Sequence, residues 1–214
     1  MDGLAITVAA AALALLAGGC RDHPHRALPH GAAPFQHLPA PVVVGRARVG
    51  SFTELRPRFP NGCLRGFSDL RRSRSTRVVE RIGALGRSFT IAAPGSPWLY
   101  ACLAASGTNE RCGGAVGEWR AGRLNDPRLD ILCTDRRGAH LGSAWVVPIR
   151  RARWISVRER HFTEVYPAAG GLPVRIWTRD GVHYEQSRAT FDVKQLSVGG
   201  SELTHQLLET VVAG

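Results

Sequence analysis

The stretch SFTIAAPGSPWLYACLAA, residues 88–105, holds the pattern that decides the fold. Two largely apolar runs, 88–93 and 98–105, stand on either side of the segment APGSP. Proline and glycine in that segment favour a turn, because proline fixes φ and glycine adopts backbone conformations that other residues avoid. The stretch therefore predicts two β-strands joined by a turn.

The same pattern recurs from Val42 to the end of the chain, with turn segments such as NDP, DRRG, AAGG and RDG between apolar runs. The further predicted strands cover residues 42–49, 114–121, 128–134, 141–149, 153–157, 162–166, 173–178, 189–196 and 206–213. Residues 77–86 and 201–212 also fit one face of a helix, and we assign both to strands. Many short strands at intervals of about ten residues predict an all-β sandwich or barrel.

The segment WLYACL, residues 98–103, resembles the tyrosine-corner strand of immunoglobulin domains, in which a tyrosine precedes a core cysteine by two residues. Tyr100 and Cys102 match that local pattern. The chain departs from the family at the upstream Cys63, which no tryptophan follows at the position that the family's core uses. The resemblance implies an immunoglobulin-like sandwich in the loose, architectural sense.

The strand pattern predicts a β-sandwich domain at residues 42–148 and a smaller β domain, or a continuation of the same core, at 149–214. The segment PIRRARW, residues 148–154, is the expected junction. The heptamers SFTELRP (51–57) and HFTEVYP (161–167) are alike. One heptamer without flanking similarity is weak evidence for a duplication.

The chain begins with an uncharged apolar segment, residues 4–17, that is shorter than the roughly 20 residues needed to span a bilayer. It predicts a signal peptide at 1–19, although Asp2 stands where positive charge is usual. The sequence AGGC that ends at Cys20 resembles the bacterial lipoprotein signal. The resemblance implies a lipid on Cys20 and an exported protein held at the cell-envelope membrane; cleavage without lipidation is the alternative.

Residues 20–41 are rich in proline and histidine, with prolines at 24, 29, 34 and 39. Regularly spaced prolines favour an extended spacer, which at about 3.1 Å per residue would reach about 60 Å. A metal-handling alternative uses four histidines of this segment to bind copper or zinc, namely His23, His25, His30 and His37. An extended chain separates these side chains, so we favour the tether.

The chain is strongly basic, with a formal net charge of +11. Basic surfaces attract anionic partners. We expect a membrane contact through the lipid, anionic envelope polymers or another envelope protein as partners. Nucleic acid is not expected, because no helix-turn-helix, finger or stacking motif accompanies the charge.

Four cysteines follow Cys20, and an even number in an exported chain predicts two disulfides. Cys102 and Cys112 flank the loop-like segment LAASGTNER, so they are candidates to bridge neighbouring strands. That pairing leaves Cys63 with Cys133. The spacings match no common structural zinc site.

No nucleophile elbow, phosphate-binding loop or zinc-protease motif is present in the sequence. An enzyme remains an alternative if histidines and carboxylates pair in one cleft; the candidates are His161, Glu164, His140 and Asp135.

The five tryptophans are expected mainly in the core, and a surface row of them would suit sugar rings. We therefore expect a non-catalytic envelope protein without a cofactor, with a binding or structural role.

Overall fold

The computed structural model describes residues 27–28, 34–39, 41–60, 63, 70, 75–84, 86–105, 111–125, 133–134, 140–159, 161–178 and 188–211. At the ends of several strands it describes the backbone alone, which applies to Cys112, Cys133, His140 and Trp177.

The described chain consists mostly of short strands. The elements are β1 (Ala27–Leu28), β2 (Val42–Val44), β3 (Arg46–Ser51), α1 (Phe52–Leu55), η1 (Arg56–Arg58), β4 (Arg77–Gly83), β5 (Gly86–Ala92), β6 (Trp98–Ala105), β7 (Arg111–Arg120), β8 (Arg123–Asn125), β9 (Cys133–Thr134), β10 (His140–Val146), β11 (Trp154–Arg158), β12 (Thr163–Pro167), η3 (Ala169–Gly171), β13 (Val174–Thr178), β14 (Arg188–Leu196) and β15 (Glu202–Val211). The prediction of an all-β fold is confirmed. Residues 77–83 and 202–211, which also fit a helix by sequence, are strands.

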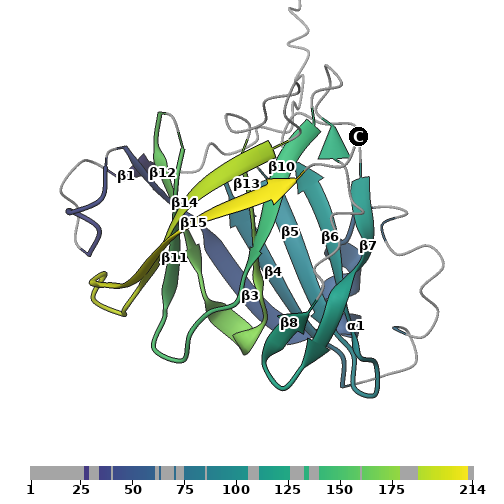
Figure 1. Cartoon of the computed structure of the whole chain (residues 1–214). Coiled ribbons are helices and arrows are strands. Elements are labelled where there is room, and N and C mark those ends of the chain that lie inside the picture. Colours follow the sequence, from purple (N-terminus) through teal and green to yellow (C-terminus); the bar gives the residue numbers. More distant parts are fainter. Residues whose placement is uncertain are drawn as a thin grey trace, which may run out of the picture.

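The strands form three sheets (Figure 1). Strands β3 to β8 make a six-stranded antiparallel meander in sequence order. A second six-stranded sheet has the order β1-β2-β12-β11-β14-β15, with only β2 and β12 parallel among its pairs. The third sheet has the order β13-β10-β9, and in Figure 1 its strand β10 lies between the other two sheets. The result is a layered, sandwich-like arrangement.

The predicted strand 42–49 is two strands in different sheets, and the chain changes sheet at Gly45. A Cβ on Gly45 would lie 2.8 Å from the carbonyl oxygen of Ile82 and 3.3 Å from that of Val165. The Gly45 amide also donates a 2.8 Å hydrogen bond to the Val165 carbonyl. A glycine is therefore needed where the two six-stranded sheets approach each other.

One apolar cluster joins strands from both sides of the predicted junction at 148–154. Strands β10 to β14 supply its nine buried members: Ala144, Val146, Ile155, Val157, Tyr166, Val174, Ile176, Phe191 and Val193. Strand β2, from the first predicted domain, also pairs with β12 of the second. Residues before and after the junction thus share a core and a sheet.

Part of the predicted spacer is packed on the fold. Phe35 is 3% exposed and Leu38 is 2% exposed, and both belong to a cluster with Val165 and Leu196. The Phe35 ring meets Trp154 edge-on, with 5.3 Å between centroids. Residues 34–39 therefore cover one face of the second six-stranded sheet.

The sequence SFTELRP contains a helical turn that the strand pattern did not predict. Ser51 caps α1, accepting from the Glu54 amide while the Glu54 carboxylate accepts from the Ser51 amide. This capping box satisfies amides that a short helix leaves open. Phe52 and Leu55 are buried against the outer face of the meander. The similar heptamer at 161–167 contributes strand β12, so the two copies have different structures.

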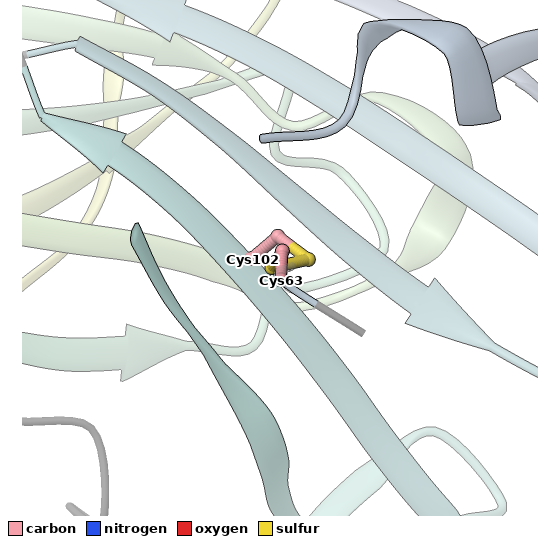
Figure 2. Close-up of a disulfide and its surroundings, with 2 residues drawn as sticks. All are labelled: Cys63 and Cys102. Carbon is pink, nitrogen blue, oxygen red and sulfur yellow. A yellow bond between two sulfur atoms is a disulfide. The ribbon is translucent and has the colours of Figure 1, made fainter. Parts of the chain in front are cut away.

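The disulfide pairing differs from the expected one. Cys63 is bonded to Cys102, with a Cα–Cα distance of 5.8 Å (Figure 2). The β6–β7 register explains why Cys102 does not pair with Cys112: Cys102 lies opposite Gly113, and Cys112 lies opposite Leu103. Neighbouring residues on a strand face opposite sides of the sheet, so the expected Cys102–Cys112 bridge is one residue out of register. The expected pairing of Cys63 with Cys133 is also wrong, because Cys63 is bonded to Cys102.

Gly113 makes room for this disulfide. A Cβ on Gly113 would overlap both the sulfur and the carbonyl oxygen of Cys63. The glycine-rich segment RCGGAVGEW, which carries no phosphate-binding motif, thus allows the close approach of residue 63 to the sheet. It also carries a register shift opposite Leu99 and Tyr100.

We predict that replacing both cysteines, Cys63→Ser with Cys102→Ser, lowers the free energy of unfolding by about 4 kcal/mol. The two residues are 39 apart in sequence, and closing a loop of that length restricts the unfolded chain by about that amount in the chain-entropy model. Urea unfolding of the variant and the wild type under oxidising conditions measures the difference. Equal stability would contradict the pairing, and Cys112→Ser serves as the matched single-cysteine control.

Candidate binding surface

Three histidines of the metal-binding alternative lie outside the described residues, namely His23, His25 and His30. The predicted lipidation site Cys20 and Asp135 of the enzyme alternative lie outside them too. His37 is exposed. Among the residues that the structure describes, no group of three or more His, Cys, Asp or Glu side chains is placed to hold a metal ion.

The two members of the enzyme alternative whose side chains the structure describes lie in different surroundings. His161 is exposed just before β12, whereas Glu164 within β12 has no exposed surface. The backbone of His140 starts β10, where it pairs with Thr134. The sequence had no signal for the burial of Glu164, apart from its position in a run of mostly apolar residues.

Glu164 is held by internal donors. The Tyr166 hydroxyl donates a 2.6 Å hydrogen bond to Glu164 Oε2, and the Ala84 amide donates to Oε1. A Cβ on Gly83 would overlap the same carboxylate. Burial raises the pKa of Glu164 to about 7, although both hydrogen bonds act in the opposite direction. This carboxyl therefore ties β12 to the end of β4.

Arg81, on β4, is a fully buried cation surrounded by oxygen acceptors. Its guanidinium donates to the carbonyl oxygens of four residues in one connecting segment and to one hydroxyl: Pro167 (3.1 Å), Ala169 (3.0 Å), Leu172 (3.2 Å), Pro173 (3.3 Å) and Thr90 Oγ1 (3.3 Å). Thr90 in turn donates to the Pro173 carbonyl at 3.2 Å. Burial lowers the pKa of Arg81 to about 9, so the side chain remains charged at neutral pH.

The guanidinium of Arg81 thus fixes residues 167–173, which connect β12 to β13, against the meander. Arg77, four residues earlier on β4, donates to the Gly170 carbonyl at 3.3 Å. The Gly170 backbone has φ of +74°, a conformation that favours glycine. The segment is held at both its ends and its middle.

The outer side of this segment forms a cleft of about 420 Å³, which we call the arginine cleft. It is lined by residues 148–150, 152–154, 167–171 and Val198. Val198 and Ile149 are 76% and 40% exposed. Arg150 and Arg153 are exposed cations on its wall, and no acidic residue is part of the described lining. The cleft therefore combines apolar surface with positive charge.

A second cavity, of about 440 Å³, lies at the β5–β6 turn, residues 93–97. Its wall includes Trp98 and Tyr100, with Pro94, Pro97 and Ser96 of the turn. The Ser96 and Tyr100 hydroxyls are 3.4 Å apart. Trp119, Trp145 and Trp154, by contrast, pack against apolar clusters, as the sequence predicts for most tryptophans.

Comparison with known proteins gives no relative for this chain. No protein-family model, no curated protein and no solved structure matches it. Within the described residues, no helix has the length and apolar character needed to cross a membrane.

The buried Glu164 predicts a pH dependence of stability. The folded protein holds the Glu164 proton up to about pH 7, whereas the unfolded chain releases it near its ordinary value of 4.5. Unfolding therefore releases a proton in this window, and the contribution of Glu164 to the free energy of unfolding falls as pH rises from 4.5 to about 7.

Urea unfolding of the wild type and Glu164→Gln at several pH values measures this contribution. We expect the wild-type stability, relative to the variant, to decline across that window and to level off above it. Glu202→Gln is the control, because the pKa of the exposed Glu202 is lowered by the hydrogen bond from Lys194. A difference between the wild type and Glu164→Gln that is independent of pH would contradict the assignment.

Proposed function

We propose that this chain is an exported cell-envelope protein, held at the membrane by a lipid on Cys20, whose β-sheet body has a non-catalytic binding role. The observation that carries the proposal is the Cys63–Cys102 disulfide, with 5% and 0% of the two residues exposed. Structural disulfides persist in oxidising compartments and are rare in the bacterial cytosol. This supports export, in agreement with the apolar leader.

The described body begins close to the proposed anchor. Ala27 of β1 is seven residues after Cys20, and seven extended residues span at most about 25 Å. Because residues 34–39 pack on the fold, the free part of the spacer is shorter than the prolines alone suggest. A lipid on Cys20 would therefore hold the folded body near the membrane surface.

Two buried carboxylates, Glu164 and Glu80, are used inside the fold. Glu164 binds Tyr166 and Ala84, and the buried Glu80 lies 2.7 Å from Arg58 Nε and 3.3 Å from Arg87 Nε. The arginine cleft offers apolar surface and arginines without an ion-pair partner among the described residues, which suit recognition of an anionic partner. These features support binding rather than chemistry.

We predict that Cys20→Ala moves the protein from the membrane to the soluble periplasmic or extracellular fraction. Membranes are washed with about 1 M salt, because salt screens charge-mediated contacts and leaves an acyl chain inserted. The wild type is expected in the washed membrane pellet and Cys20→Ala in the supernatant. Cys112→Ser is the control for loss of a cysteine elsewhere.

Retention of Cys20→Ala in salt-washed membranes would contradict lipid anchoring. Thiol labelling of the same fractions reports on export separately. An exported protein is expected to have Cys63 and Cys102 oxidised, whereas free thiols at both positions in the native cell would contradict export.

A further inference from the structure

We propose that the arginine cleft docks directly on anionic phospholipid, with its exposed apolar side chains at the headgroup boundary and its arginines against lipid phosphates. This inference rests on one part of the proposed function, the location of the folded body at a membrane. The docking itself needs no lipid on Cys20.

The exposed apolar residues gather at this cleft. Four large apolar side chains are strongly exposed in the described chain: Val49, Ile149, Val198 and Leu207. Ile149 and Val198 line the cleft, and Val49 lies beside it, since a Cβ on the cleft residue Gly170 would be 3.3 Å from Val49 Cγ2. Gathered exposed apolar groups of this kind mark interaction surfaces.

Positive charge surrounds the same apolar groups. Arg150, Arg151 and Arg153 are exposed, and none of the three has an ion-pair partner among the described residues. The nearby acid Glu202 is engaged by Lys194 at 2.7 Å. Basic residues at a membrane surface are attracted by anionic headgroups, and arginine forms paired hydrogen bonds to phosphate.

Each wall of the cleft is fixed by buried or local hydrogen bonds. The Ile149 amide donates to the side chain of the buried Gln195 at 2.8 Å, and the Ala152 amide donates to the Ile149 carbonyl at 2.9 Å. Arg81 holds the segment 167–173 from inside. The cleft is therefore shaped before any partner arrives, which reduces the entropy lost on binding.

The turn that carries Val198 is fixed in the same way. The Gly200 amide donates to the Ser197 carbonyl at 3.1 Å, and the Ser201 amide donates to Ser197 Oγ at 3.1 Å. Gly200 has φ of +85°, and a Cβ there would overlap the Pro34 carbonyl. A rigid turn thus displays a side chain that is 76% exposed, in the manner of an apolar residue that enters a lipid interface.

Membrane docking fits these observations better than binding of a soluble anionic polymer. A polymer of charged groups would be recognised by the arginines alone and would gain nothing from burying Ile149 and Val198. A lipid surface presents phosphate and hydrocarbon within one layer, which matches both features of the cleft.

The test uses the full mature chain from residue 20 with Cys20→Ala, so that no lipid is attached. It is sedimented with vesicles of phosphatidylcholine alone and of phosphatidylcholine with about one quarter phosphatidylglycerol. We expect binding to the anionic vesicles only, and a steep loss of binding as salt is raised. Equal binding to both vesicles, or none to either, would overturn the proposal.

Two pairs of variants locate the contact. Arg150→Glu with Arg153→Glu is expected to weaken vesicle binding by about tenfold or more. Arg120→Glu with Arg123→Glu makes the same change in charge at the exposed β7–β8 turn and is expected to have a much smaller effect. Equal losses in the two double variants would show that net charge alone attracts the protein, and would overturn the cleft as the site.

The apolar pair separates membrane from polymer. Val198→Ser is expected to weaken vesicle binding by several fold, whereas Leu207→Ser, at a residue 68% exposed on β15, is expected to leave it unchanged. If Val198→Ser has no effect and dextran sulfate competes fully with vesicles, the cleft is a polyanion site and the membrane proposal is wrong. Because the probe carries no lipid, these outcomes are independent of the Cys20 fractionation.

Discussion

The attachment of the β12–β13 connection to the meander depends on a buried cation, Arg81. Arg81 has no exposed surface, and its guanidinium is hydrogen-bonded to four backbone carbonyls and the Thr90 hydroxyl. A charge without such partners would be very costly to bury, so the four carbonyl groups of residues 167–173 must stay in place whenever the protein is folded. That requirement attaches the β12–β13 connection to the meander and, on the outer side, fixes a wall of the arginine cleft.

Other internal contacts also join segments that are distant in sequence. Glu164 links β12 to the end of β4, and the Cys63–Cys102 disulfide fastens residue 63 to strand β6 of the meander (Figure 2). Gly45, Gly83 and Gly113 each stand where another group leaves no space for a Cβ. Rigidity in the interior thus accompanies an outer surface on which apolar and cationic groups are displayed in fixed positions, an arrangement suited to binding.

Residue patterns predicted the strands well and the long-range contacts poorly. Alternation and turn residues located β5, β6, β14 and most other strands, because these signals are local. The change of sheet at Gly45 and the helical turn at α1 depend on neighbours distant in sequence or on a capping pair that the strand pattern hides. The disulfide was mispaired because its partner is set by the β6–β7 register, which the spacing of cysteines does not reveal. The cleft brings together residues 149, 170 and 198, which only the tertiary structure shows.

Amide hydrogen exchange of the wild type and of Arg81→Lys, compared peptide by peptide, measures how far Arg81 holds residues 167–173 in place. Lysine keeps the positive charge but has three donors at a single point, so it cannot reach the same set of carbonyls. We expect faster exchange in residues 167–178 of the variant, while β5 and β6 keep their wild-type protection. A folded Arg81→Lys protein with unchanged exchange in residues 167–178 would contradict this role of Arg81.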